Sequence, residues 1–343
     1  MIGNNGADRE AVVRHVQDRY GFTGVGIAAL NLGADAGADT FRLVADGGAY
    51  FLKLRRDGAD DTRARLQDFL AAANAGRVLA PLPDRDGRLV TEFDGGAVVL
   101  YPFVDGRSGF ATALTQGQWE ELGAAVRALH SVDLPSALRA AVRVEAYGPQ
   151  WRDKVRGHLA TDPPPQRLPD APARELAALL KARRPQLSTL VERAEQLAAV
   201  LRGKDVRPVL CHGDLHAGNV MVADDGSLVV VDWDEPVLAP RERDLMFIGG
   251  GVGGVWNEPA ESAAFYRGYG AQEIDAQALA YYRCERIVRD IAEYCDQLLF
   301  GTPRDGDSDD HRARELSLRQ FAGQFRPGDV VDIAGRTYAA LRG

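Results

Sequence analysis

The sequence is poor in cysteine and has no long apolar run. Its 343 residues include three cysteines, at positions 211, 284 and 295, and no C-x-x-C pair. Neither a disulfide framework nor a cysteine zinc site is therefore indicated, and we expect reduced, buried thiols. No stretch approaches the roughly 18–20 apolar residues of a membrane span, and the first residues lack a basic region followed by an apolar one. We expect a cytoplasmic protein with no membrane partner.

Basic residues are outnumbered, and few of them are lysines. Forty-nine acidic residues against forty-one basic ones give a net charge of −8. This balance argues against nucleic acid as a partner and is compatible with a cationic small molecule. Only four of the basic residues are lysines, so a lysine inside an apolar stretch stands out. The length suffices for two lobes with cores of their own, and we expect a monomer or a weak dimer.

The first hundred residues read mainly as strands. Apolar spacing predicts a helix over residues 10–20 and another over 61–74. Runs of β-branched and aromatic residues bounded by turn residues predict strands over 26–32, 40–45, 49–54, 88–93 and 97–100. The remainder of the chain reads as helices, which we expect over 119–131, 174–201 in two segments broken near Pro185, 261–269, 276–300 and 312–325. The prediction is an α+β fold with an N-terminal sheet lobe over residues 1–101 and a larger, mostly helical lobe over 102–343.

Lys53 lies within the apolar third strand, in the run YFLKL. It is either an edge lysine turned to solvent or a cation with a partner. The loop at residues 33–38, between the first two strands, carries two glycines. It could offer backbone N–H groups to phosphates, although a plain turn is the alternative.

The stretch at residues 212–219 reads HGDLHAGN and precedes an apolar hairpin. Pairing across a four-residue turn at 224–227 places Val220 opposite Val231, and one step further Asn219 opposite Asp232. Directly opposed residues have Cβ atoms roughly 4.5–5.5 Å apart, so an amide oxygen and a carboxylate can converge on Mg²⁺.

Asp214 lies five residues before Asn219, in a loop flanked by glycines that can carry it towards the same point. One carboxylate held apart as a base, together with two oxygen ligands for a cation, is what metal-assisted phosphoryl transfer to a hydroxyl requires.

This stretch resembles the aminoglycoside phosphotransferases, which have a protein-kinase-like fold, a catalytic loop H-G-D-x-x-x-x-N and a metal loop I-D-x-x. The resemblance implies that Asp214 is the catalytic base, that Asn219 and Asp232 hold Mg²⁺, and that Lys53 binds the α- and β-phosphates of ATP, or alternatively of GTP.

The resemblance also implies that the backbone near Leu100 and Pro102, in the connector between the lobes, binds the adenine. In the family an acid on the helix after the lysine strand pairs with that lysine. The helix here has no Glu, so Asp68 is the candidate, with residues 60 and 61 as rivals. An acid after the metal loop braces the catalytic loop through backbone N–H groups in the family, which implies that role for Asp244.

The continuation DWDEP at residues 232–236 and the segment 239–253 are similar to the spectinomycin phosphotransferase branch. This implies an aminocyclitol or aminoglycoside antibiotic as substrate, with spectinomycin as the first choice. Asp234 and Glu235 adjoin the metal loop and are candidates for binding it. Glu293 and Asp296, on neighbouring faces of a helix, could present two carboxylates to an ammonium group or form an ordinary solvated face.

Other interpretations remain open. His212, Asp214 and His216 could instead ligate a metal for hydrolysis with Asp232, although that leaves Lys53 and the N-terminal sheet unexplained. The alternative for His212 is that it hydrogen-bonds the backbone of its own loop. Residues 249–254 match G-x-G-x-x-G but lack the strand-turn-helix context of a dinucleotide site. A kinase of choline, homoserine or a sugar, and a nucleotide-binding scaffold without activity, are the alternative functions.

Overall fold

The computed structural model describes residues 8–30, 38–56, 58, 60–161, 163–301 and 308–342. These residues form the expected α+β fold, with an antiparallel sheet near the N-terminus and a mostly helical remainder. They group into two compact units. The first unit is Met1–Arg143 with Gly218–Pro236, and the second is Val144–Ala217 with Val237–Gly343. The lobe boundary expected between residues 101 and 102 stays a prediction.

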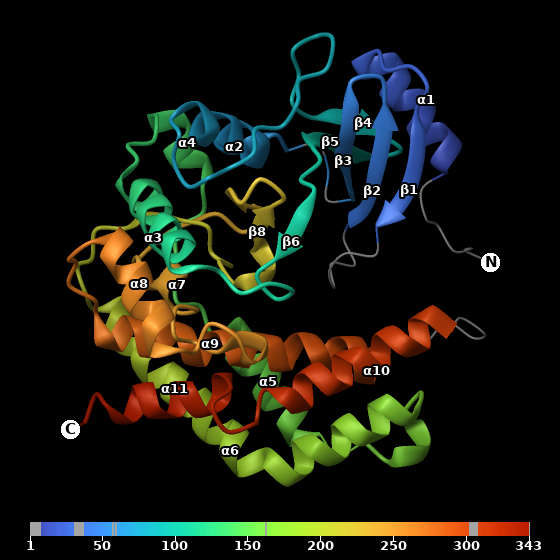
Figure 1. Cartoon of the computed structure of the whole chain (residues 1–343). Helices are drawn as coiled ribbons and strands as arrows, with labels where there is room; N and C mark the ends of the chain where they lie inside the picture. The colour runs from blue at the N-terminus through green and yellow to red at the C-terminus, as the bar shows by residue number, and fades with distance from the viewer. Residues whose placement is uncertain are drawn as a thin grey trace. The chain divides into compact units, whose positions relative to one another are not determined.

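An antiparallel sheet opens the first unit, with strand order β1-β2-β3-β5-β4 (Figure 1). Its strands are β1 (Gly26–Leu30), β2 (Ala38–Ala45), β3 (Gly48–Arg55), β4 (Thr91–Phe93) and β5 (Gly96–Pro102). Alternate residues of the central strands are buried, such as Leu43, Leu52 and Leu100, and they pack against Val12 and Val16 of helix α1 (Arg9–Tyr20). Because strand side chains alternate, Lys53 is on the face opposite to this core.

The remainder of the first unit combines helices with a second small sheet. The helices are α2 (Thr62–Ala72), α3 (Gln116–Ser131) and α4 (Ser136–Ala141), and the strands are β6 (Gly106–Ser108), β8 (Val220–Ala223) and β9 (Leu228–Val230). The order β6-β8-β9 makes β8 the central strand. The sequence patterns missed β6 and α4, which are too short to show a period.

The expected register of the β8–β9 hairpin is wrong by one residue. Val220 pairs with Val230 rather than with Val231. The cause is the turn, in which Gly226 has a φ of 85° and its N–H donates to the Ala223 carbonyl at 2.8 Å. A tight turn followed by a left-handed glycine uses three loop residues, not the four that we expected.

The corrected register moves Asp232 past the end of the ladder. The N–H of Val231 donates to the Asn219 carbonyl at 2.9 Å, so Asn219 lies opposite Val231 and not opposite Asp232. Asp232 then adopts a φ of 62°, which non-glycine residues seldom do and which often marks a functional position. Buried Trp233 follows, and its Nε1 donates to the Val230 carbonyl at 3.1 Å.

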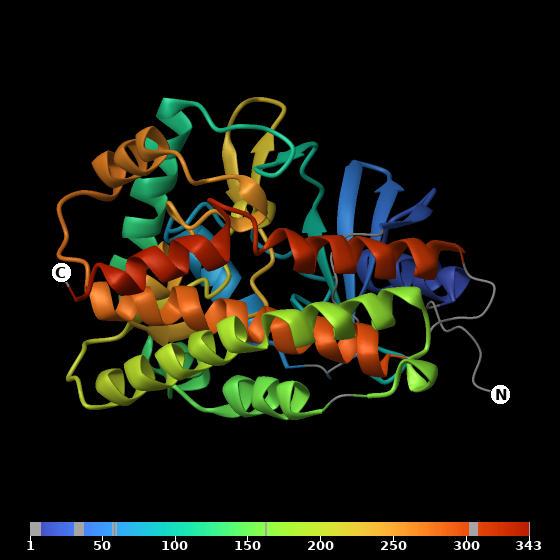
Figure 2. The same cartoon turned by 90° about the horizontal axis from the view of Figure 1, so that it is seen from below.

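The second unit is built mainly from helices around α9 (Figure 2). Its elements are α5 (Gln150–Ala160), α6 (Ala171–Arg202), β7 (Val209–Cys211), β10 (Val237–Ala239), α7 (Glu242–Leu245), α8 (Pro259–Tyr269), α9 (Ala276–Cys295), α10 (Ser308–Gly323) and α11 (Val330–Ala339). Helix α9 continues into a π-helical turn over Asp296–Phe300. Fully buried Ile291, Leu298 and Phe321 belong to the core shared by α6, α9, α10 and α11.

Helix α6 is continuous where we expected a break. Pro185 lies inside it, although proline lacks the N–H that would bond to the preceding turn. Buried leucines on both sides of the proline, such as Leu180 and Leu187, belong to the same core. Their burial therefore holds both halves in one helix despite the lost hydrogen bond.

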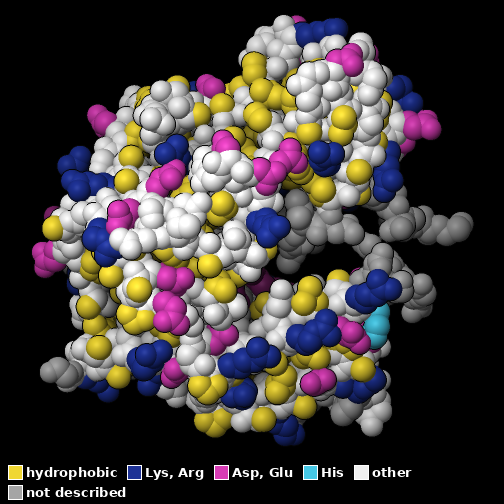
Figure 3. Space-filling view, in the orientation of Figure 1, with side chains coloured by type: hydrophobic (Ala, Val, Ile, Leu, Met, Phe, Trp, Pro, Cys, Tyr) yellow, Lys and Arg dark blue, Asp and Glu magenta, His cyan; other side chains and the backbone are white. Residues whose placement is uncertain are grey.

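The structure bears on the expectations about the cysteines, the surface charge and the apolar helices. The three cysteines are free and buried, as predicted. The face drawn in Figure 3 carries Lys and Arg side chains interspersed with Asp and Glu, so the net negative charge is not gathered into one patch of that face. Over the described ranges, no helix has both the length and the apolar character that crossing a bilayer needs.

Candidate active site

In the first unit, Lys53 on β3 pairs with two carboxylates of the segment after β9. Its Nζ lies 3.1 Å from Asp232 Oδ1 and contacts Asp234 Oδ2. Only 13% of the Lys53 side chain is exposed, so it is not an edge lysine turned to solvent. Burial disfavours the charged amine, but Asp232 and Asp234 outweigh it and raise the pKa of Lys53. The amine is therefore a fixed cation next to two acids.

The two acids that follow Asp232 also face cations of the first unit. Asp234 lies 3.8 Å from Arg63 Nη1 in addition to its contact with Lys53. Burial opposes its ionisation, but Lys53 holds the pKa of Asp234 below its usual value. Glu235 lies 3.9 Å from Arg143 Nη2. The structure thus brings Asp234 to Lys53, and the substrate contacts expected of both acids stay predictions.

The acid expected on α2 is not brought to Lys53. Asp68 is exposed on that helix, and in the described part of the chain Lys53 pairs with neither Asp60 nor Asp61. Asp60 accepts the N–H of the first α2 residue, and Asp61 lies 3.7 Å from an arginine one turn along the helix. The Lys53–Asp68 pair predicted from the family pattern is absent here because buried Gln67, not Asp68, faces inward.

The residues predicted to bind adenine lie at the end of β5. Leu100 is fully buried, and its carbonyl accepts the Leu82 N–H at 2.7 Å. Pro102 is exposed and lies opposite Tyr50 of β3. Their role stays a prediction. Of the expected phosphate loop at 33–38, residues 33–37 lie outside the described residues.

Asn219 and Asp232 stand at the open end of the β8–β9 hairpin. Asn219 is 7% exposed and ends a short 3₁₀ turn, and Asp232 follows the hairpin's second strand by two residues. One amide oxygen and one carboxylate are the hard oxygen donors that Mg²⁺ prefers. The donor set therefore fits the cation that the sequence predicts.

In the second unit, Asp244 of α7 braces the catalytic-loop motif. Its two oxygens accept the backbone N–H groups of His212 at 2.9 Å and Gly213 at 2.8 Å. The Nδ1 of His212 in turn accepts the Asp214 N–H at 3.2 Å. These contacts confirm the bracing role predicted for Asp244 and the local role of His212. The hydrolytic metal site loses support because His212 is fully buried with that nitrogen already engaged.

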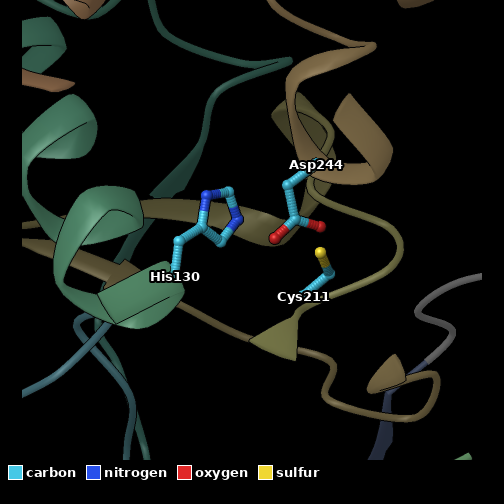
Figure 4. Close-up of side chains that lie close together, drawn as sticks. All are labelled: His130, Cys211 and Asp244. Carbon is cyan, nitrogen blue, oxygen red and sulfur yellow. The ribbon is translucent and has the colours of Figure 1, made fainter. Parts of the chain in front are cut away.

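Cys211, the last residue of β7, lies next to Asp244. Figure 4 shows the side chains of Cys211 and Asp244 pointing toward one another. Burial, reinforced by the Asp244 charge, raises the pKa of the Cys211 thiol well above its usual value. The thiol is therefore protonated at neutral pH.

Asp214 is flanked by a cation and by a neutral ring of the second unit. Its Oδ1 contacts Arg286 of α9, and its Oδ2 lies 3.6 Å from His216 Nε2. Burial alone would raise the pKa of Asp214, but Arg286 and neighbouring cations lower it to about 2. Burial lowers the pKa of His216 to about 4. At neutral pH the carboxylate is ionised and the imidazole is uncharged.

Arg286 is a residue of the site that the sequence patterns did not indicate. It belongs to no motif, and α9 carries several similar charges on its faces. Only the fold of the second unit selects Arg286 as the residue that reaches Asp214.

The predicted carboxylate pair, Glu293 of α9 and Asp296 of the following π-helical turn, already has cationic partners. Glu293 accepts from Arg289 Nε at 2.7 Å, one turn earlier on the same helix. Asp296 contacts Lys154 of α5 and lies 3.5 Å from His158 Nε2. A substrate ammonium group would have to compete with these partners, and the role of both acids stays a prediction.

We predict that Asp244→Asn destabilises the second unit. The amide keeps one acceptor oxygen but turns an NH₂ group toward a backbone N–H, so one buried donor loses its partner. The expected loss in the free energy of unfolding is about 1–3 kcal/mol, measured by urea denaturation. An unchanged unfolding midpoint would show that the two backbone contacts do not support the loop.

Comparison with known proteins gives consistent matches over most of the chain. The model of the phosphotransferase enzyme family matches residues 29–283. The solved structure of spectinomycin phosphotransferase APH(9)-Ia, in complex with ADP and spectinomycin, is 32% identical with a TM-score of 0.87, and the match covers 97% of this chain and 99% of that one.

Two further relatives are more distant. Protein StrN of Streptomyces griseus is 28% identical over 285 residues, which is 79% of this chain and 81% of that protein. The structure of the amicoumacin kinase hAmiN, at 17% identity and a TM-score of 0.59, covers 93% of this chain and 94% of its own. It shares the fold alone. The kinase-like fold predicted from the catalytic-loop motif is thereby confirmed.

Proposed function

Because this chain belongs to the phosphotransferase enzyme family, we propose that it transfers the γ-phosphoryl group of ATP, or of GTP, to a hydroxyl of an aminocyclitol antibiotic, with spectinomycin as the first substrate. The choice of spectinomycin as substrate is supported by the 32% identity to a spectinomycin phosphotransferase over 97% of the chain. The observations that support the reaction are the ionised Asp214 and the Lys53 cluster, each within its own unit.

On the nucleotide side, the first unit supplies the phosphate-binding groups. Lys53, held charged by Asp232 and Asp234, places a cation for the α- and β-phosphates. Asn219 and Asp232 would hold Mg²⁺, which when bound neutralises charge on the phosphates. The backbone at Leu100 and Pro102 is the proposed adenine contact.

On the acceptor side, Asp214 is the proposed general base. Its ionised carboxylate takes the proton of the substrate hydroxyl, while the hydroxyl oxygen bonds to the γ-phosphorus and the bond to the β–γ bridging oxygen breaks. The acidic candidates for the cationic substrate are Asp234, Glu235, Glu293 and Asp296.

The alternative functions make different demands. A kinase of choline, homoserine or a sugar would use the same base and the same nucleotide site on another hydroxyl. A nucleotide-binding scaffold would need neither Asp214 ionised nor Lys53 paired, so the presence of both disfavours it.

A panel of acceptors tests the substrate. We expect kcat/KM with ATP and Mg²⁺ to be highest for spectinomycin among spectinomycin, streptomycin, hygromycin, kanamycin, choline and homoserine. The product is identified by the mass of one added phosphoryl group. A higher kcat/KM for another acceptor would refute the substrate and keep the reaction, and ATP binding without transfer to any of them would favour the scaffold.

A further inference from the structure

Arg286 of α9 lies between two carboxylates of the second unit. Its Nη1 donates to Asp214 Oδ1, and its Nε donates to Asp290 Oδ1 at 2.8 Å. The guanidinium also stacks over the ring of Phe247, with 5.5 Å between Cζ and the ring centroid. Only 19% of the Arg286 side chain is exposed. A planar guanidinium engaged on two edges and one face has little freedom to rotate.

Asp290 is itself held in place. It lies one helical turn after Arg286, and its Oδ2 accepts from Gln324 Nε2 at 3.0 Å. Burial raises the pKa of Asp290 to about 6, against the pull of Arg286 and with Glu293 and Asp214 nearby. The remaining charged neighbour on α9 is Arg289. Asp290 therefore holds the Nε side of the Arg286 guanidinium in place within the second unit.

The two oxygens of Asp214 have different surroundings. Oδ1 faces the Arg286 guanidinium, whereas Oδ2 faces His216 at 3.6 Å. The His216 ring packs edge-on against Phe247, with 5.7 Å between centroids, so one phenylalanine supports both neighbours. Burial keeps His216 uncharged at neutral pH. A cation therefore engages one oxygen and a neutral ring lies beside the other.

We infer that Arg286 is a positioning residue for the phosphotransfer: anchored by Asp290 and Phe247, it fixes Oδ1 of Asp214 so that Oδ2 receives the proton of the acceptor hydroxyl. This inference rests on the proposed function, in which Asp214 is the base. Arg286 itself contacts neither substrate nor phosphate in this scheme. It restricts the rotation of the carboxylate and favours its ionised form.

Removing the charge of Arg286 should affect the chemical step more than binding. For Arg286→Gln we expect kcat to fall by about 10–100-fold, as when a supporting partner of an active-site ligand is removed, with KM for ATP within about twofold. The acid limb of kcat/KM should move up by about 1–3 pH units, because an opposite charge lowers a carboxyl pKa by that amount. Other charged or titratable groups near Asp214 include His212 and His216 of its own loop and Arg289 and Asp290 of α9, all unchanged in this variant.

Conservative variants separate positioning from charge. Arg286→Lys keeps the charge but offers one nitrogen in place of the two, Nε and Nη1, that donate to Asp290 and Asp214, so kcat should fall while the acid limb moves by less than in Arg286→Gln. Asp290→Asn keeps Arg286 but weakens its anchor, and kcat should again fall. The control is Arg336→Ala, which removes another arginine that faces an aspartate one turn away, 3.5 Å from Asp332 on α11. Its kcat and pH profile should match the unmodified protein.

The outcomes distinguish this inference from the proposed function. An active Asp214→Asn would refute the proposed base, and with it the premise. An inactive Asp214→Asn together with unchanged kcat and an unchanged acid limb in Arg286→Gln would overturn the role of Arg286 alone. Should Arg286→Gln melt at the assay temperature, Arg286→Lys and Asp290→Asn decide, since kcat equal to that of the unmodified protein in both would overturn the inference.

Discussion

Asp214→Asn should lower kcat by about 10²–10⁴-fold, the contribution typical of a positioned general base, while ATP still binds. Asparagine has the shape of aspartate but cannot take up the proton of the acceptor hydroxyl. Asp214 lies in the second unit, whereas Lys53, Asn219 and Asp232 lie in the first, so the nucleotide site keeps all its proposed groups. The checks are steady-state kinetics with spectinomycin and calorimetry with ATP and Mg²⁺.

The matched control for this prediction is Asp332→Asn. Asp332 is a half-exposed aspartate on α11 that pairs with Arg336 at 3.5 Å. The same substitution there should leave kcat unchanged within about twofold, as surface substitutions away from special features generally do. Equal turnover by Asp214→Asn and Asp332→Asn would rule out Asp214 as the base.

Asp232→Ala should remove the dependence of ATP binding on Mg²⁺. The variant loses the only carboxylate among the two proposed Mg²⁺ ligands, and we expect the affinity for ATP with Mg²⁺ to fall by at least about 100-fold, the upper range for removing a supporting partner of a metal ligand. Affinity in the presence of EDTA should change much less. Titration calorimetry with and without Mg²⁺ measures both quantities.

Asp234→Ala is the comparison that separates metal binding from the pairing of Lys53. Asp234 also contacts Lys53, but it is not a proposed Mg²⁺ ligand. Its replacement should weaken ATP binding by similar factors with and without Mg²⁺. If the two variants responded alike to Mg²⁺, the assignment of Asp232 as the ligand would fail.

The sequence predicted contacts of the site that are local or that the family resemblance implied. The bond from Asp214 N–H to His212 Nδ1 joins near neighbours in the chain, whereas the bracing of His212 and Gly213 by Asp244, 32 and 31 residues away, followed from the resemblance. The strands around Lys53 followed from alternating apolar residues, because a half-buried sheet imposes a period of two.

The parts that failed depend on single backbone positions or on distant contacts. The hairpin register changed by one residue because Gly226 adopts a left-handed conformation, which pattern matching cannot distinguish from a four-residue turn. Pro185 stays inside α6 because burial on both sides outweighs a local preference. The pairing of Lys53 with Asp232 joins residues 179 positions apart, and the contact of Arg286 with Asp214 joins residues 72 positions apart. No local sequence pattern indicates such pairings.

The most direct test of the central claim follows the phosphoryl group itself. The protein is incubated with ATP labelled at the γ-phosphorus, Mg²⁺ and spectinomycin, and the antibiotic is separated and examined for label. We expect one labelled phosphoryl group on a spectinomycin hydroxyl with the unmodified protein and almost none with Asp214→Asn. Unlabelled spectinomycin after complete incubation, with ATP bound throughout, would contradict the account.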